Sequence, residues 1–379
     1  MSNRSMTEPS KMSRILIFSQ RNIFKKFHYR CCLAEFEDLI CQMDNAELLA
    51  PQSKNYFKYG ARIANRLASH YGIWVNPGIA ETKLKKDYDL FFAFCQFPRD
   101  LLHVETVKGW KDRCKTSICW LAEIWISELA QSRYYLNILS KFDYVILHWS
   151  QSVNPVNDVI GGGKAFFLPL GIDAILFCPY PNPPQRLIDV YSIGRRSDET
   201  HRALLEMSEK NNMFYLYDSI IGREVMDTNQ HRTLFANLIK RSKYFIVNPG
   251  KIDVPEETKD QSEIGLRYFE GAAGGSIMIG EHPKTEEFKK IFYWKDAVIH
   301  IPYGSNKIQE KIAEFDGQSR RQAEVRKKNV LESLRKHDWA YRWETMLKTA
   351  GLEPMPGLLE RKNRLETLSK VIENEKDLL

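Results

Sequence analysis

Short apolar runs alternate with amphipathic segments along the first half of the chain. Four runs have the length and composition of buried strands, at residues 14–19, 87–95, 115–122 and 142–150. The segments 31–43 and 59–73 instead space their apolar residues as one face of a helix does. Strands that alternate with helices predict an α/β fold, with a parallel sheet covered by helices on both faces.

The same alternation restarts in the second half, after the proline-dense segment 169–186. Proline-rich stretches between periodic regions are typical of linkers, so we interpret this one as an interdomain hinge. Strand-like runs then recur at 189–194, 244–249, 276–280 and 297–302. A chain of 379 residues is also long for one core and suits two.

These patterns predict a first domain over residues 1–172, a second over 173–345 and a helical tail over 346–379. We expect Trp339 and Trp343 to lie on a late helix that crosses back between the domains and packs into the core. The tail is a charged amphipathic helix with balanced signs, and we expect it to pack on its own domain. Contact with a partner or a membrane is the alternative for this helix.

Composition and charge narrow the class of protein only in part. The chain is 43% apolar and 12% aromatic, which favours packed domains. Its net charge of +7 is spread without a basic block, so we expect no nucleic-acid partner, while an anionic small molecule or membrane surface stays compatible. Seven cysteines without a CxxC pair argue against a disulfide framework or a zinc site.

Targeting signals are absent from the expected places. The first 14 residues have no apolar core of a signal peptide, and no run of about 18 uncharged apolar residues occurs. We therefore expect a cytoplasmic protein, with peripheral contact at the inner face of the membrane left open.

Several familiar phosphate and metal motifs do not fit. The segment IGGGK at 160–164 resembles a Walker loop, but Asp158 replaces its first glycine and Ala165 follows the lysine. No GxGxxG follows the first strand, and no DxD-like metal motif occurs. We predict no metal site and no cofactor.

The stretch GLRYFEGAAGGSIMIGE, residues 265–281, carries the clearest candidate chemistry. We expect a helix from Gly265 to Gly274 that follows a polar loop at the carboxyl edge of a parallel sheet, where ligands bind in open α/β folds. Free N–H groups around Gly265 and Leu266 suit a phosphate or a sugar hydroxyl. Glu270 offers two acceptor oxygens for a vicinal diol, and Glu263 lies roughly on the same face. An ordinary exposed glutamate is the alternative for Glu270.

This stretch and two earlier segments together resemble the signature of retaining glycosyltransferases of the GT-B fold. Glu270 falls at the second glutamate of the family pattern, and Arg267 before Phe269 is similar to the CgeB-like branch. LPLGIDAILFCPYP, residues 168–181, resembles the family's interdomain linker, and DVYSIGRR, residues 189–196, resembles the strand that ends beside the donor diphosphate. The resemblance covers about 110 residues of the second half.

The resemblance implies two Rossmann-like domains facing each other across a cleft, with a C-terminal helix crossing back. It also implies transfer of a sugar from a nucleotide-diphosphate sugar, with retention and without a metal. The first domain would hold the acceptor and the second the donor. The implied acceptor is an unidentified glycan, lipid or protein.

The same resemblance assigns roles to residues of the second domain. Glu270 would hold the ribose, with Gly265 and Leu266 at the phosphates. Arg195 would meet the leaving diphosphate, with Arg202 or His201 as the next cation. Asn248 ends a segment, residues 231–249, that resembles the one flanking the nucleotide base.

One departure from the family pattern concerns catalysis. Ser262 stands where the family has its first glutamate, and Glu263 is one position late. We assign Glu263 and Arg195 to catalysis, with an inverting transferase, a sugar-nucleotide epimerase or a non-catalytic nucleotide-sugar-binding protein as alternatives. In the first domain, His103, Glu123 and His148 are possible cleft groups near strand ends.

Overall fold

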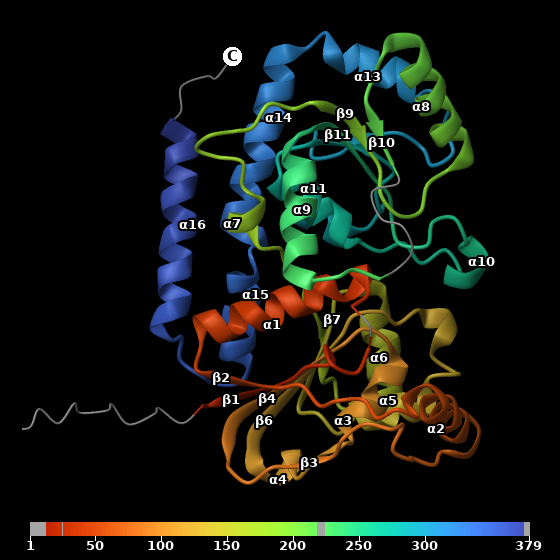
Figure 1. The fold of residues 1–379 in the computed structure, drawn as a ribbon, viewed down its shortest axis with the longest axis vertical. Helices are drawn as coiled ribbons and strands as arrows, with labels where there is room; N and C mark the ends of the chain where they lie inside the picture. The colour runs from red at the N-terminus through yellow and green to blue at the C-terminus, as the bar shows by residue number, and fades with distance from the viewer. Residues whose placement is uncertain (1–12, 25, 218–223, 375–379) are drawn as a thin grey trace, which may run out of the picture.

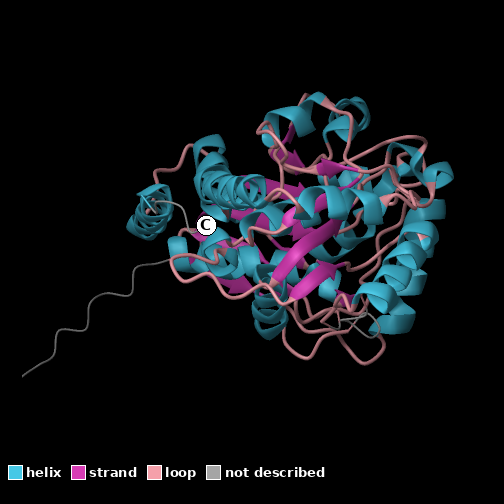
Figure 2. Ribbon diagram, turned by 90° about the horizontal axis from the view of Figure 1, so that it is seen from above, coloured by secondary structure: helices cyan, strands magenta, loops and turns pink. Residues whose placement is uncertain are grey.

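The computed structural model describes residues 13–24, 26–217 and 224–374, and it has two α/β domains one above the other (Figure 1). The first 12 residues of the first predicted domain and the last five of the tail lie outside this range. Each domain has its own parallel sheet, as Figure 2 shows from above, with helices around the strands.

The N-terminal domain is built on a six-stranded parallel sheet in the order β2-β1-β4-β6-β7-β8. Its strands are β1 (Ile15–Phe18), β2 (Ala46–Leu49), β4 (Tyr88–Cys95), β6 (Cys114–Leu121), β7 (Tyr144–Leu147) and β8 (Ala165–Phe167). Strand β4 pairs with both β1 and β6, and every side chain of β4 except Asp89 is buried, as expected for a strand covered on both faces. A small pair, β3 (Thr82–Lys83) and β5 (Val107–Lys108), lies outside this sheet.

The C-terminal domain has a five-stranded parallel sheet in the order β10-β9-β11-β12-β13. Its strands are β9 (Ile188–Tyr191), β10 (Tyr215–Leu216), β11 (Ser242–Val247), β12 (Ile277–Gly280) and β13 (Ile299–His300). The helices between these strands are α8 (Asp198–Asn211), α9 (Thr228–Lys240), α10 (Pro255–Thr258), α11 (Leu266–Ala273) and α12 (Glu286–Ile291). The alternation predicted from the apolar pattern is therefore confirmed in both halves.

The helices of the N-terminal domain include α1 (Cys31–Met43), α2 (Phe57–Tyr71), α5 (Arg133–Leu139) and α6 (Val153–Ile160), with the shorter α3 (Leu101–Val104) and α4 (Trp110–Arg113). Helix α1 buries nearly all of one broad face because it lies between its own sheet and helix α9 of the other domain. Helix α2 buries only Ala64 and Ala68 and ends at Gly72, whose φ of 66° favours glycine.

The late helices cross back to the first domain, as predicted. Helices α13 (Ile308–Asp316) and α14 (Ser319–Glu332) belong to the second domain, whereas α15 (Trp339–Thr349) and α16 (Pro356–Asn374) reach helix α1 (Figure 1). Trp339 stacks on Phe36 of α1 with ring centroids 4.4 Å apart, and Trp343 Nε1 donates to Asp44. Trp339 and Trp343 are thus core residues, as expected.

The proline-rich segment differs from the expected linker. It contains the short helix α7 (Ala174–Phe177), which Asp173 caps by accepting a hydrogen bond from Leu176 N. Ile172 is fully buried, and Arg361 Nη2 lies 2.7 Å from a carboxylate oxygen of both Asp173 and Asp338. The segment is therefore a packed junction between the domains rather than an open linker, because buried apolar and charged contacts hold it on both sides.

Candidate functional site

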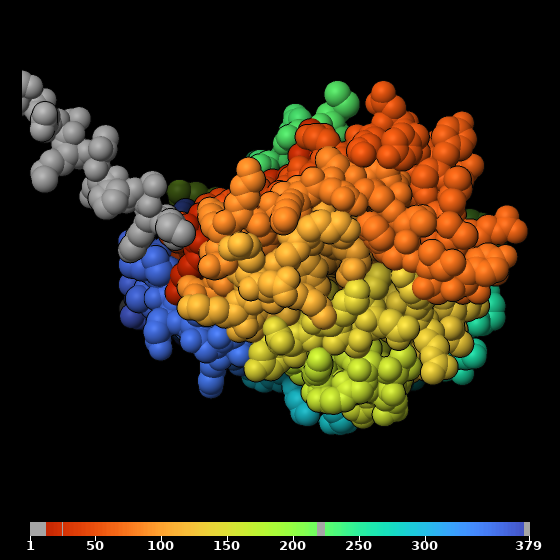
Figure 3. Space-filling view, turned by 90° about the horizontal axis from the view of Figure 1, so that it is seen from below, coloured from red at the N-terminus to blue at the C-terminus, as the bar shows by residue number. Residues whose placement is uncertain are grey.

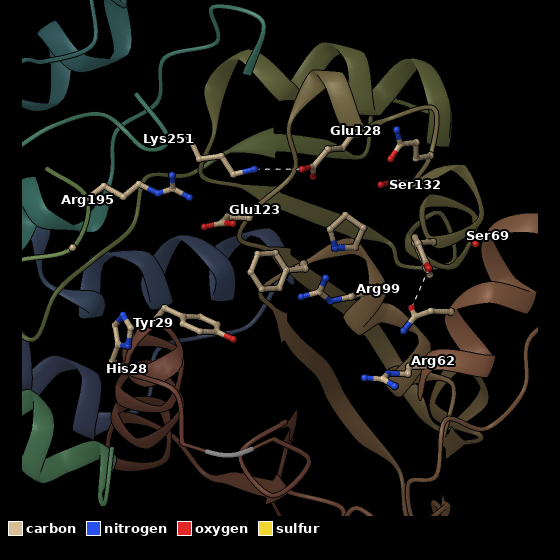
Figure 4. Close-up of a pocket in the computed structure, with 16 residues that line it drawn as sticks. His28, Tyr29, Arg62, Ser69, Arg99, Glu123, Glu128, Ser132, Arg195 and Lys251 are labelled. Atoms are coloured by element: carbon tan, nitrogen blue, oxygen red, sulfur yellow. Dashed lines mark hydrogen bonds and ion pairs between the residues drawn. The ribbon is translucent and has the colours of Figure 1, made fainter. Parts of the chain in front are cut away.

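A cleft of about 1120 Å³ opens between the two domains, and its lining residues follow the carboxyl ends of parallel strands. Phe97 and Arg99 follow β4, Glu123 follows β6, Gly194 and Arg195 follow β9, and Lys251 follows β11. This edge is where open α/β sheets bind ligands, since the strands end there and the loops diverge. Figure 4 shows Arg195 and Lys251 on one wall, with Arg62 and Arg99 on the opposite side.

Arg195 reaches the cleft from the loop after β9, as the sequence predicted for a cation beside the donor. Its guanidinium lies 2.7 Å from Asp253, and its side chain is 53% exposed. Exposed ion pairs contribute little to stability, so Arg195 can exchange Asp253 for a stronger anion at low cost. A diphosphate with several charged oxygens is such an anion.

Lys251 is a second cation on the same wall, and the sequence analysis did not single it out. It follows the end of β11 in a turn with a φ of 53°, and its ammonium nitrogen lies 3.5 Å from Glu128 and 3.2 Å from Glu257. The sequence could have indicated Lys251, because it is the first basic residue after the strand predicted at 244–249.

Glu123 and Glu128 are carboxylates of the N-terminal domain that line the cleft, and Figure 4 places Glu123 between the two cations and Tyr29. Burial raises the pKa of the Glu123 carboxyl to about 7, although the nearby cations Lys251 and Arg195 act to lower it. A carboxyl group with this pKa can take up or release a proton near neutral pH.

His103 and His148, the other two cleft groups considered in the first domain, lie inside the protein instead. Burial lowers the pKa of His103 to about 4 and that of His148 to about 3, so both rings are neutral at neutral pH. Neither histidine lines the cleft.

Glu263 connects the two domains rather than facing the cleft. Its two carboxylate oxygens accept hydrogen bonds from the backbone N–H groups of Ser150 and Gln151, both at 3.1 Å, and from the Gln261 side chain at 2.8 Å. Burial raises its pKa to about 7. In this conformation the carboxylate caps the short helix η4 (Ser150–Ser152) of the other domain, so a catalytic role would require these hydrogen bonds to be exchanged.

Glu270 is fully buried, and both of its oxygens are occupied by arginines. Arg232 of α9 donates to one oxygen at 2.5 Å and Arg267 of α11 to the other at 2.6 Å. Arg232 also donates to Glu35 of helix α1 at 2.7 Å. The side chain is therefore not an exposed helix glutamate, and its proposed ribose contact would have to replace the half-buried Arg267.

The pKa values of Glu270 and Glu35, the two carboxylates in contact with Arg232, are shifted in opposite directions. Burial opposes ionisation of Glu270, but Arg267 and Arg232 together hold its pKa below the usual value. Burial raises the pKa of Glu35, which shares one arginine and lies near Asp173. The difference follows from the number of cations in contact with each carboxylate.

Of the remaining residues predicted to bind the nucleotide sugar, Gly265, Leu266 and Asn248 lie near one another, whereas Arg202 lies elsewhere. Gly265 begins helix α11, and the carbonyl oxygen of Asn248 lies 4.0 Å from where a Cβ on Gly265 would stand. The structure thus brings Asn248 near Gly265 and Leu266, both half-buried. Arg202 lies exposed on α8 and is not among the residues that line the interdomain cleft.

A second pocket lies within the C-terminal domain, behind the loop that carries Arg195. Asn248, His201 and Tyr303 are among its lining residues, together with Arg196 and Ser197, which follow Arg195 in the chain. Its free volume is only about 20 Å³, about that of one water molecule. The interdomain cleft, with about 1120 Å³, has room for a ligand of several hundred cubic ångströms, which this small pocket lacks.

Among the described residues, no group of three or more histidine, cysteine, aspartate or glutamate side chains is placed to hold a metal ion. None of the described helices is long and apolar enough to span a bilayer.

Comparison with known proteins agrees with the resemblance seen in the sequence. Residues 214–348 match the family model described as glycosyl transferase-like, a range that includes Lys251, Glu263 and Glu270. The search of curated proteins returned no significant match.

Solved structures share the fold over nearly the whole chain. HepE from Anabaena, in complex with UDP and glucose, is 12% identical with a TM-score of 0.53, covering 89% of this chain and 99% of its own. Sucrose-phosphate synthase from Thermosynechococcus elongatus is 10% identical with a TM-score of 0.53, covering 88% and 97%. An alpha-glucosyltransferase in complex with UDP and a 13-mer DNA is 9% identical with a TM-score of 0.51, covering 89% and 99%. The chain therefore has the GT-B fold, and its resemblance to the GT-B glycosyltransferases is confirmed.

Proposed function

We propose that the chain is a hexosyltransferase that moves a sugar from a nucleotide-diphosphate sugar to an acceptor, with retention of configuration and without a metal ion. The observation that most supports this proposal is the interdomain cleft. There, Arg195 and Lys251 of the second domain face Glu123 of the first. A family match over residues 214–348 supports the same reading. The proposed acceptor is a glycan, lipid or protein, and the proposed location is the cytoplasm.

The electrostatics of the cleft suit a leaving diphosphate. Negative charge builds on that group as the bond to the sugar breaks, and fixed cations that already point at it stabilise the transition state. Arg195 and Lys251 occupy that position, and their carboxylate partners are half-buried or exposed. In the proposed arrangement, Arg195 meets the diphosphate while Asn248, Gly265 and Leu266 hold the nucleotide side of the donor, with Glu270 at the ribose once Arg267 moves.

Release of nucleoside diphosphate by the intact chain, measured across UDP-, GDP-, ADP- and dTDP-sugars, tests this proposal directly. UDP-hexoses are the first donors to try, because the related HepE was solved in complex with UDP and glucose. We expect one nucleotide to be preferred and its release to depend on an added acceptor fraction. Nucleotide binding with no release from any donor would instead favour a non-catalytic binding protein. Formation of an epimer of the donor would favour an epimerase.

A second candidate, an inverting transferase, is favoured by one observation. An inverting reaction needs a base that takes the proton of the acceptor hydroxyl, and Glu123 projects into the cleft from the acceptor-side domain. The stereochemistry of the glycosidic product, followed by NMR, separates the two mechanisms.

If the inverting candidate holds and Glu123 is the base, we expect the pH dependence of transfer to report Glu123. Its carboxyl has a pKa of about 7, so the ionised form grows as the pH rises through 7, and kcat/KM should rise with it. In Glu123→Gln the side chain cannot ionise, and we expect a lower rate, about 10²-fold or more below that of the parent, without the rise near pH 7. Rates measured from pH 5.5 to 8.5 check this, and an unchanged profile in the variant would remove Glu123 from the reaction.

A further inference from the structure

Helix α2 presents an unusual combination of apolar and basic side chains to solvent. Tyr59, Ile63 and Tyr71 on the helix are 65%, 58% and 70% exposed, and Tyr56 and Ile73 beside it are also more than half exposed. Scattered apolar side chains are common on surfaces, but five within eighteen residues form a contiguous feature. In Figure 3 the orange segment that includes α2 projects from the body of the N-terminal domain.

The charged side chains in and around α2 are all basic. Lys54, Lys58, Arg62 and Arg66 lie within residues 48–80, and that stretch contains no aspartate or glutamate. Lys58, Arg62 and Arg66 form no ion pair with any described residue. Lys58 and Arg66 are therefore available to an external anionic surface, whereas Arg62 lines the interdomain cleft.

Helical geometry gives α2 three faces. Ala64 and Ala68 face the core, and Arg62, Asn65 and Ser69 line the interdomain cleft. Tyr59, Ile63 and Arg66 fall on the remaining side, because residues three and four apart share a face of a helix. The outward face is thus separate from the cleft and adjacent to it.

We propose that this outward face of α2, with Tyr56, Tyr71 and Ile73, docks on a lipid bilayer that carries anionic headgroups. Apolar side chains interleaved with Lys and Arg suit a helix that lies in the plane of the bilayer interface, where tyrosine side chains are also favoured. An anionic surface complements the excess of positive charge. A second copy of the same face is disfavoured by the repulsion between like charges.

The tail helix, the earlier candidate for membrane contact, has its apolar side engaged elsewhere. Leu358, Leu365 and Ile372 of α16 are fully buried against the protein, where α16 meets α1, α14 and α15. Docking through α2 would hold the cleft beside the bilayer. Delivery of a lipid-borne acceptor to Arg62 and Asn65 is a consequence that rests on the proposed function, whereas docking itself does not.

Sedimentation with vesicles tests the docking. We expect the intact chain to bind vesicles of phosphatidylglycerol and phosphatidylcholine, to bind pure phosphatidylcholine much less, and to be released by 0.5 M salt through screening. Ile63→Glu and Arg66→Glu should each lower the partition coefficient about tenfold or more, by loss of apolar burial and by charge reversal respectively. The control is Leu234→Glu, which alters a leucine of α9 that is 55% exposed and should bind as the parent does.

The following results would overturn the proposal that α2 docks on an anionic bilayer. Absence of vesicle binding, or binding that Ile63→Glu leaves unchanged in a variant with the parent's melting temperature, overturns the proposal. Dimers that Ile63→Glu disrupts, or capture of an acidic protein without vesicle binding, would also overturn it. Donor turnover assayed without vesicles reports on the proposed function separately, so failure of one does not imply failure of the other.

Discussion

Replacing Arg232 by methionine should lower the free energy of unfolding by about 3–5 kcal/mol. Arg232 is fully surrounded by protein and contacts Glu35 of one domain and Glu270 of the other. Its removal leaves Glu35 buried without a cation and Glu270 with Arg267 alone, and the cost of burying an unpaired charge exceeds the value of the pair itself. Denaturant unfolding followed by tryptophan fluorescence measures the change.

The matched control for Arg232 is Arg320→Met. Arg320 forms an exposed ion pair with Glu324 at 3.0 Å within helix α14, and its loss should change stability by less than about 1 kcal/mol. Adding Glu35→Gln and Glu270→Gln to Arg232→Met should recover part of the lost stability, because the uncompensated charges are then gone. A loss in Arg232→Met no larger than in the control would show that the cluster does not hold the domains together.

Arg195→Ala should reduce the rate of nucleoside diphosphate release by about 10²–10³-fold at saturating donor. The expected loss falls mainly on kcat, since the guanidinium would act on charge that develops as the leaving group departs. Stability should change little, because the ion pair of Arg195 with Asp253 is exposed. Initial rates with the preferred donor, together with the melting temperature, measure both effects.

Arg320→Ala also serves as the control for Arg195, since it removes an exposed arginine of the same domain far from the cleft lining. Its rate should equal that of the parent. If Arg195→Ala stays within twofold of the parent, Arg195 is not the cation that meets the diphosphate, and Lys251 becomes the residue to test.

The elements of the fold could be predicted because each depends on neighbours in sequence. The apolar run of β4 and the helical spacing of α1 predict their structures without knowledge of the rest of the chain. The alternation of strands and helices then predicts a parallel sheet, and a parallel sheet predicts that ligand-binding loops follow strand ends. Arg195 was assigned from the family resemblance of residues 189–196, whereas the rule of strand ends would also have indicated Lys251.

Contacts between distant segments could not be predicted in the same way. The apolar neighbours of Glu270 favoured a ligand contact over an exposed glutamate, with a ribose diol as the predicted partner, and did not indicate the two arginines that the structure shows. The first partner, Arg232, lies 38 residues earlier in the chain, and Arg232 in turn contacts Glu35 in the other domain. With 55 basic and 48 acidic residues, the sequence allows very many pairings, and only distance in space selects among them.

The sequence alone thus determined the two α/β units, the resemblance to GT-B glycosyltransferases and the loop that carries Arg195. The tertiary structure decided which charges meet, that Glu263 and Glu270 lie in domain contacts, and that the apolar and basic face of α2 is left uncovered. The physical reason is that local structure follows from the period of apolar residues, whereas burial and ion pairing follow from how the two domains pack.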